Sequence, residues 1–380
     1  MIVVIHGGEV FAPEPRGPQA VVMVGHRVTY VGAVKPATIK VPGVTVDVVD
    51  ARGCVVVPGL IDPHEHLIGG SGERGFASQT PEIALRELVR GGITTVVGCL
   101  GVDTTTRTLP ALLAKTKGLR KEGLSAFMYT GGYNVPPTTL TGSIRSDIMY
   151  LDPVLGAGEV AISDVRGTEP TVRELARLAH DAYVGGLLSG KCGVTHLHVG
   201  DKATRLAPVR ELLDEHEVPP EWLYPTHVER HRALMLEAVE LSARGVTMDI
   251  DVVEEDLPVW LRLMDDWNAD WSRFTISSDA GIKAPATLHA QLVASVRQGF
   301  ALERVLPLCT SNTARVLKLS HKGRLAPGVD ADVLVLERDS LAVRHVFSRG
   351  RCLMRDGALR VQEAYLPASN RVLDQRGGKS

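Results

Sequence analysis

The spacing of apolar residues changes twice along this chain and divides it into three parts. Residues 1–55 contain short apolar runs such as Ile2–Ile5, separated by glycine and proline, which is typical of a small all-β unit. Residues 56–325 alternate between apolar strand-like runs and segments with a helical period. Beyond residue 325 the strand-like runs return, for example Val343–Val346. The pattern therefore predicts an α/β chain whose two ends both consist of strands.

Eight strands are predicted in the central part, with helical segments such as Thr171–Leu188 and Arg232–Arg244 between most of them. The strands are predicted over Val55–Ile61, Ile93–Val97, Leu124–Met128, Glu159–Ile162, Val194–Val199, Trp222–Pro225, Val246–Ile250 and Phe274–Ser277. Eight strands that alternate with helices favour a (β/α)8 TIM-like barrel over an open doubly wound sheet. No glycine-rich phosphate loop follows the first strand, which further disfavours a dinucleotide-binding fold.

Both ends of the chain are expected to join in one unit. The TIM-like barrel is assigned to residues 56–325, while residues 1–55 and 326–368 together are expected to form a small composite β-sandwich domain. Residues 369–380 are polar and glycine-rich, and we predict that they are disordered.

Composition excludes several classes of partner. The 380 residues carry a formal net charge of −2, so a nucleic-acid partner, which requires a basic surface, is not expected. No apolar run reaches the roughly 20 residues of a membrane span, and the N-terminus lacks the basic and apolar regions of a signal peptide. The five cysteines form no C-x-x-C pair, which disfavours a disulfide framework. A cytoplasmic protein without membrane contact is expected.

Among thirteen histidines, two are placed where a barrel builds its active site. His64 and His66 lie at the C-terminal end of the first barrel strand, and residues i and i+2 of a strand point to the same face. Taken alone, the pair is equally consistent with two surface histidines in a turn. His198, His227 and Asp279 also follow predicted strands, so that all five side chains converge on one barrel mouth.

Imidazole and carboxylate groups at one mouth suit zinc, with manganese, iron or cobalt as substitutes. His196 shares a strand face with His198 but lies one pleat nearer the barrel interior. We therefore expect His196 to pack behind the metal site rather than to bind the metal.

Several segments resemble a known family. Pro58–His66 resembles the first-strand signature of the amidohydrolase superfamily, and Gly328–Val335 resembles the signature of its C-terminal β domain. Within that superfamily the sequence is similar to isoaspartyl (β-aspartyl) dipeptidases over nearly the whole chain. The segments that carry this similarity are Gly69–Glu73, Thr130–Tyr133, Ile162–Arg166, His198–Asp201, Pro225–Arg230 and Ser277–Asp279.

The resemblance implies a metal-dependent hydrolase of β-aspartyl dipeptides that forms a homo-oligomer. It implies two divalent metal ions, most commonly Zn2+, one bound by His64, His66 and Asp279 and the other by His198 and His227. Asp279 would also act as general acid and base.

The same resemblance implies the substrate contacts. Tyr133 would polarise the scissile carbonyl, Glu73 would hold the free α-amino group, and Arg166 and Arg230 would receive carboxylates. From the residues alone, the two arginines are equally compatible with loop salt bridges, Tyr133 with a packed aromatic, and Glu73 with a solvated carboxylate. A guanidinium pairs with a carboxylate through two parallel hydrogen bonds, which suits the proposed role of the arginines.

One departure from the family pattern concerns the metals. The family bridges its two ions with a carboxylated lysine on the fourth strand, where this chain has Glu159. A glutamate can bridge two ions directly, but its side chain is shorter, so its backbone must come closer. The small residues Gly156, Ala157 and Gly158 could allow that approach. The alternative is that Glu159 misses the metals and that one ion binds.

Two further departures concern the substrate. Lys283 stands where the family has a serine, and Val102 replaces a threonine near the substrate. Lys283 could clamp a substrate carboxylate or fill part of the pocket, and Val102 removes one hydrogen bond. An alternative function is therefore hydrolysis of another amide, such as an N-acyl amino acid, a cyclic amide or a specialised metabolite. A non-catalytic barrel homologue is a further alternative.

Overall fold

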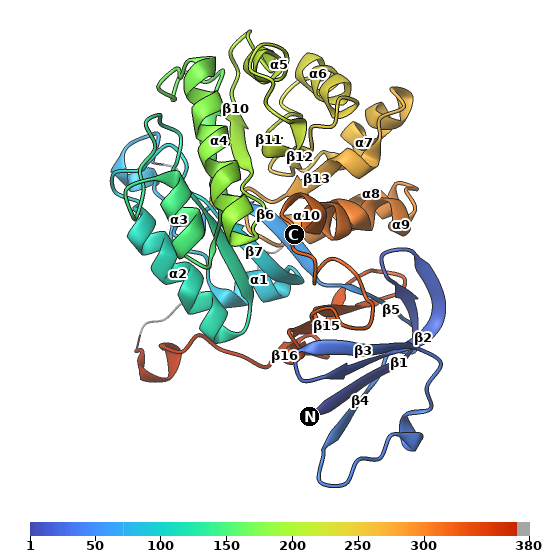
Figure 1. The fold of residues 1–380 in the computed structure, drawn as a ribbon. Helices are drawn as coiled ribbons and strands as arrows, with labels where there is room; N and C mark the ends of the chain where they lie inside the picture. Colours follow the sequence, from blue (N-terminus) through green and yellow to red (C-terminus); the bar gives the residue numbers. More distant parts are fainter. Residues whose placement is uncertain (71, 371–380) are drawn as a thin grey trace.

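The computed structural model describes residues 1–70 and 72–370, and Figure 1 shows their arrangement. A barrel of strands and helices occupies the middle of the chain, and strands from both ends of the chain pack beside it. The predicted disordered tail lies outside the described residues from position 371 onward.

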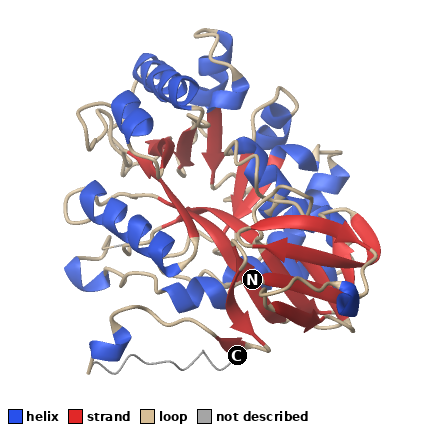
Figure 2. Ribbon diagram, turned by 60° about the horizontal axis from the view of Figure 1, so that its bottom comes forward, coloured by secondary structure: helices blue, strands red, loops and turns tan. Residues whose placement is uncertain are grey.

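The sequence predicts that the two chain ends join in one β unit, and among the described residues they form one mixed sheet of nine strands. Its strands are β1 (Ile2–Phe11), β2 (Pro15–Val24), β3 (Arg27–Gly32), β4 (Val46–Asp50), β5 (Cys54–Pro58), β14 (Val333–Glu337), β15 (Val343–Ser348), β16 (Arg351–Arg355) and β17 (Ala358–Leu359). The order is β17-β16-β15-β14-β5-β1-β2-β3, with β4 paired to β1. Figure 2 distinguishes all strands, in red, from the helices, in blue. Ile5 and Met23 share one buried core with Val333 and Phe347, so the sheet folds over a core to which both ends contribute.

Eight parallel strands form the barrel. They are β6 (Leu60–Glu65), β7 (Ile93–Gly98), β8 (Ser125–Thr130), β9 (Val154–Ile162), β10 (Thr195–Val199), β11 (Leu223–Thr226), β12 (Met248–Asp251) and β13 (Phe274–Ser277). Strands β6 to β11 are hydrogen-bonded in sequence order, and β12 pairs with β13. The backbone N–H of His66 donates to the carbonyl of Ala280 at 2.8 Å, which joins the last strand to the first. The predicted barrel is confirmed.

Helices cover the outside of these strands (Figure 1). They are α1 (Leu85–Arg90), α2 (Leu109–Glu122), α3 (Ile144–Tyr150), α4 (Val172–Ser189), α5 (Ala207–Asp214), α6 (Arg232–Ser242), α7 (Leu257–Asp266), α8 (Thr287–Arg297), α9 (Leu302–Val305) and α10 (Ser311–Val316). Helix α4 begins with a capping box, in which Thr171 accepts from the N–H of Glu174 and the Glu174 carboxylate accepts from the N–H of Thr171.

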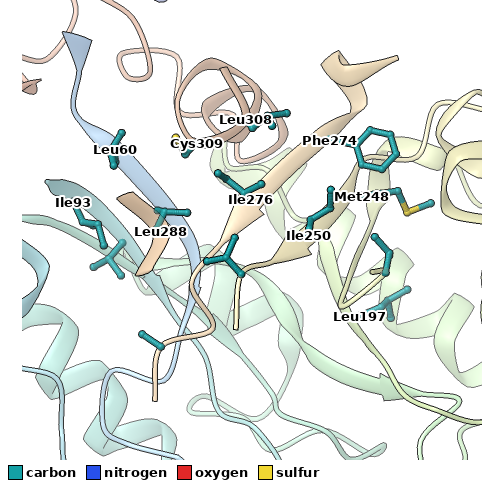
Figure 3. Packing of buried hydrophobic residues seen from close by; sticks show 14 of the residues in the cluster. Leu60, Ile93, Leu197, Met248, Ile250, Phe274, Ile276, Leu288, Leu308 and Cys309 are labelled. Atoms are coloured by element: carbon teal, nitrogen blue, oxygen red, sulfur yellow. The ribbon is translucent and has the colours of Figure 1, made fainter. Parts of the chain in front are cut away.

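The hydrophobic core lies between the barrel strands and the helices. Figure 3 shows Ile93 and Leu288 on one side of this core, with Ile250, Ile276 and Leu308 packed further along it. All of these side chains are buried. Apolar burial of this kind is the main favourable term in the free energy of folding. The C-terminal ends of the strands carry polar side chains instead.

The first predicted barrel strand is in fact two strands. Val55–Ile61 was expected to be continuous, but β5 belongs to the β domain and β6 to the barrel, with Gly59 between them. A Cβ atom at position 59 would lie 2.1 Å from the Oγ1 of Thr94, so only glycine fits at this crossing. Both segments are apolar because both are buried, which is why periodicity alone does not separate them.

Candidate metal centre

The five side chains predicted as metal ligands from strand ends lie together at the C-terminal mouth of the barrel. His64 belongs to β6 and His66 follows it directly, while His198 belongs to β10. His227 and Asp279 follow β11 and β13 with φ values of 64° and 46°. Residues other than glycine rarely adopt this left-handed backbone conformation. Backbone strain of this kind concentrates at functional sites.

Glu159 lies at the centre of this cluster. Its Oε1 is 3.5 Å from the Nε2 atoms of both His64 and His66. Its Oε2 is 2.9 Å from the Nδ1 of His198 and 3.5 Å from the Nε2 of His227. The two oxygens of one fully buried carboxylate therefore face two different pairs of histidines. A carboxylate in this position is within reach of donor atoms on both sides.

The polar atoms of the cluster lack ordinary partners. The Nε2 of His64, the Oε1 of Glu159 and the Oδ1 of Asp279 are buried and have no hydrogen-bond partner among the described residues. Buried polar atoms are nearly always hydrogen-bonded, so three unpaired atoms at one point mark a place suited to a bound cation. The Oδ1 of Asp279 is 3.3 Å from His64 Nε2 and 3.1 Å from His66 Nε2. Imidazole and carboxylate donors in this arrangement fit a metal ion.

The glycines before Glu159 allow its backbone to approach the next strand. A Cβ atom at Gly158 would lie 2.7 Å from both the Cβ and the carbonyl oxygen of His196, and one at Gly156 would lie 2.3 Å from the carbonyl oxygen of Val194. Only glycine avoids these contacts. The two glycines therefore let β9 lie close to β10 just before Glu159.

His196 lies behind His64 and determines which of its nitrogens is free. The Nδ1 of His196 is 2.9 Å from the carbonyl oxygen of Tyr224, which can only accept, so Nδ1 carries the proton. Burial holds the pKa of His196 well below its usual range, so the ring is neutral and its Nε2 accepts from the Nδ1 of His64 at 2.9 Å. The Nε2 of His64 is thereby the ring nitrogen that faces Glu159 and Asp279. The sequence prediction that His196 packs behind the site agrees with this arrangement.

Asp251 performs the same role for His227, and the sequence reasoning missed it. The Nδ1 of His227 donates to the Oδ2 of Asp251 at 2.6 Å, which leaves Nε2 to face Glu159. A histidine that binds a metal commonly donates its other N–H to such a partner. Asp251 ends β12, so the strand-end rule that identified Asp279 could also have identified it.

The neighbouring histidines keep the Glu159 carboxylate charged. Burial raises the pKa of this group, but His64 and His198 beside it outweigh burial and hold the pKa well below its usual range. An ionised carboxylate is the form that binds metal ions.

A small pocket opens beside the cluster. Its walls include His66, Glu73, Val102, Tyr133 and Arg107. The Tyr133 hydroxyl is 2.8 Å from the Nδ1 of His198. Burial, together with the negative charge of Glu159, raises the pKa of Tyr133 well above its usual value, so the hydroxyl keeps its proton at neutral pH.

Both arginines that the resemblance singled out lie beside His198. Arg166 donates through Nε and Nη2 to the two carboxylate oxygens of Asp164, and its Nη1 donates to Glu73 at 2.8 Å. Its Nη2 lies 3.0 Å from the Nε2 of His198. Arg230 donates through Nε to a backbone carbonyl, and its Nη2 lies 3.5 Å from the same His198 nitrogen. Arg166 thus connects Glu73 to the metal cluster.

The cavity wall differs from the sequence prediction at two residues, Lys283 and Arg107. Lys283 forms an ion pair with Glu255 at 2.8 Å on the surface, and the cavity walls do not include it. Its predicted contact with substrate stays a prediction. Arg107, which the sequence pattern does not single out, lines the cavity, and its buried Nε has no hydrogen-bond partner among the described residues. Its position five residues after Val102 is the signal that could have identified it.

The fold and this cluster define a barrel hydrolase with a metal-binding mouth. The chain belongs to the amidohydrolase family, whose model matches residues 55–353. More particularly, the chain is a homologue of the β-aspartyl dipeptidase from the thermophilic, keratin-degrading Fervidobacterium islandicum AW-1. That crystal structure matches with a TM-score of 0.92 and 38% identity, over 96% of this chain and all of the other.

A second crystal structure of the same dipeptidase, in complex with a β-Asp-Leu dipeptide, matches with a TM-score of 0.90 and 37% identity, over 96% of this chain and 100% of the other. Among curated proteins, an adenine deaminase from Halalkalibacterium halodurans is 41% identical over 57 residues, which are 15% of this chain. The match spans only 10% of that deaminase. Among the described residues, no helix has both the length and the apolar character needed to cross a membrane.

Replacing His196 with phenylalanine keeps the ring volume but removes both ring nitrogens. We expect the affinity for zinc to fall about 10- to 100-fold, because the His64 imidazole loses the partner that fixes its orientation. Competition with a chromophoric chelator measures this affinity. His180, an exposed histidine on α4, serves as the matched control in the variant His180→Phe. Equal affinity in His196→Phe and wild type would contradict the role assigned to His196.

Proposed function

We propose that this protein is a β-aspartyl dipeptidase that hydrolyses the amide between the side-chain carbonyl of an aspartyl residue and the amine of the next residue. The observation that carries the proposal is the Glu159 carboxylate, whose two oxygens face separate histidine pairs beside a cavity lined by Glu73 and Tyr133. The match to a dipeptidase crystallised with β-Asp-Leu supports the choice of substrate.

The proposed centre holds two zinc ions. His64, His66 and Asp279 would hold one ion, His198 and His227 the other, and Glu159 would contact both. Divalent ions supply a nucleophile near neutral pH by lowering the pKa of water, and they polarise carbonyl oxygens. The unpaired, buried donor atoms described above support this assignment.

The protein's own residues move the proton and stabilise the developing charge. Asp279 is 23% exposed and borders the cluster, so its carboxylate can take the proton from the attacking water and deliver it to the leaving amine. Tyr133 keeps its hydroxyl proton at neutral pH and can donate it in a hydrogen bond to the carbonyl oxygen as negative charge develops there.

Charged side chains around the cavity match the ends of the substrate. A β-aspartyl dipeptide has a free α-amino group and two free carboxylates. The Glu73 carboxylate offers a partner for the amino group, and the guanidinium groups of Arg166 and Arg230 offer partners for the carboxylates. The contact between Arg166 and Glu73 at 2.8 Å keeps opposite charges side by side, as a zwitterionic substrate requires.

A panel of amides tests the substrate assignment. Metal-replete protein is expected to hydrolyse β-Asp-Leu in preference to α-Asp-Leu and to N-acetyl-β-Asp-Leu, because Glu73 pairs with a free ammonium group. Glu73→Gln is expected to lower kcat/KM for β-Asp-Leu roughly 10- to 100-fold, since a charged hydrogen bond is lost. Chromatography of released leucine measures the rates.

The matched control for that panel is Glu82→Gln. This substitution removes an exposed carboxylate that forms an ion pair with Lys115. It should leave the rates unchanged. Faster hydrolysis of the N-acetylated compound than of the free isopeptide would reject the dipeptidase assignment. That result would favour the alternative of another amide substrate, such as an N-acyl amino acid. Val102 in the cavity wall is compatible with this alternative, because valine cannot form the hydrogen bond that a threonine offers.

Removing the Tyr133 hydroxyl tests its part in the reaction. Tyr133→Phe is expected to lower kcat for β-Asp-Leu about 100-fold while KM changes much less, because the hydroxyl stabilises charge that develops only in the transition state. Steady-state kinetics separate the two constants. Tyr150→Phe, at an exposed position on α3, is the control. An unchanged kcat in Tyr133→Phe would exclude the proposed role.

A further inference from the structure

Two histidines of the candidate metal centre are held from behind by a polar partner. His64 donates its Nδ1–H to His196, and His227 donates its Nδ1–H to Asp251. In both, the Nε2 atom faces the carboxylate at the centre of the cluster. Ring nitrogens that bind metal ions are typically oriented in this way.

His66 has the same arrangement with an unusual partner, a thiol. Its Nε2 is 3.1 Å from the Oδ1 of Asp279, and its Nδ1 is 3.8 Å from the Sγ of Cys99. Cys99 directly follows β7 and is only 1% exposed. The backbone N–H of Cys99 donates to the carbonyl of Glu65 at 3.0 Å, which fixes the cysteine beside the histidine.

The hydrogen bond of the thiol explains its orientation. The Cys99 Sγ lies 3.6 Å from the same Glu65 carbonyl oxygen, which can only accept, so the S–H points there. The sulfur lone pairs are then available to the Nδ1–H of His66. The thiols of two other buried cysteines, Cys192 and Cys309, donate to the backbone carbonyls of Leu155 and Leu306.

We propose that Cys99 is a positioning residue of the metal centre: its sulfur accepts a hydrogen bond from the His66 Nδ1–H and holds the His66 Nε2 toward the ion. The inference rests on the metal centre of the proposed function, but not on the identity of the substrate. The direct alternative is that the sulfur itself binds the ion. The Cys99 sulfur belongs to a group of four possible ligand atoms that all lie within 4.8 Å of one another, the other three coming from His64, His66 and Glu159. The contact through Nδ1 rather than Nε2 favours the positioning role.

A pair of substitutions tests the hydrogen bond. Cys99→Ala removes the acceptor, and Cys99→Ser retains one, since a hydroxyl can also accept from Nδ1–H and donate to the Glu65 carbonyl. Cys99→Ala is expected to release one of its two zinc ions at about tenfold lower chelator concentration than wild type, whereas Cys99→Ser should remain within about twofold of wild type. Zinc content per chain after graded chelator treatment is the readout.

Cys192→Ala is the matched control, because Cys192 is equally buried but bonds to the carbonyl of Leu155. It should release zinc as wild type does, and circular dichroism verifies that each variant is folded. X-ray absorption at the zinc edge of the wild-type protein tests the alternative without any substitution. The proposal expects only nitrogen and oxygen around zinc, and a sulfur neighbour at about 2.3 Å would overturn it.

Three further outcomes would overturn the proposal: wild-type zinc retention in Cys99→Ala, equal loss in the alanine and serine variants, or no zinc in the wild-type protein. The last of these would also reject the metal centre of the proposed function. Zinc-loaded protein that fails to hydrolyse β-Asp-Leu would reject only the substrate assignment, and the comparison between the Cys99 variants would still decide the present proposal.

Discussion

The site depends on one fully buried carboxylate, that of Glu159, which lies between two pairs of histidines. An isolated buried carboxylate would cost several kcal/mol, so it is retained only where positive charge or hydrogen bonds compensate. Here His198 is in hydrogen-bond contact at Oε2, while Oε1 has no partner among the described residues. The unpaired Oε1 is therefore open to a bound cation, and in the proposed centre Oε2, which faces His198 and His227, would contact the second.

The surrounding structure determines where that carboxylate lies. Gly156 and Gly158 allow β9 to approach β10 closely, which delivers a short side chain to the centre of the mouth. Behind the histidines, His196 and Asp251 each take one N–H and leave the opposite nitrogen free. The donors are therefore oriented before any ion binds, which lowers the cost of ordering them.

Most of this could be predicted from the sequence because strand ends of a parallel barrel must meet at one mouth. His64, His198 and Asp279 follow from that rule, and Asp251 would have followed had it been applied to every strand. The division of Val55–Ile61 into two strands could not be predicted, because both halves are buried and equally apolar. The ion pair of Lys283 with Glu255 joins loops far apart in sequence, and local pattern carries no information about such contacts.

The central claim is that Glu159 holds two ions, and zinc stoichiometry of the wild type and Glu159→Gln tests it most directly. The amide of glutamine has a similar size but carries no charge, so it cannot balance two cations. Elemental analysis of protein equilibrated with zinc and freed of excess metal should give about two ions per chain in the wild type and one or none in the variant. A single ion in the wild type, or two ions retained with unchanged affinity in Glu159→Gln, would contradict the account.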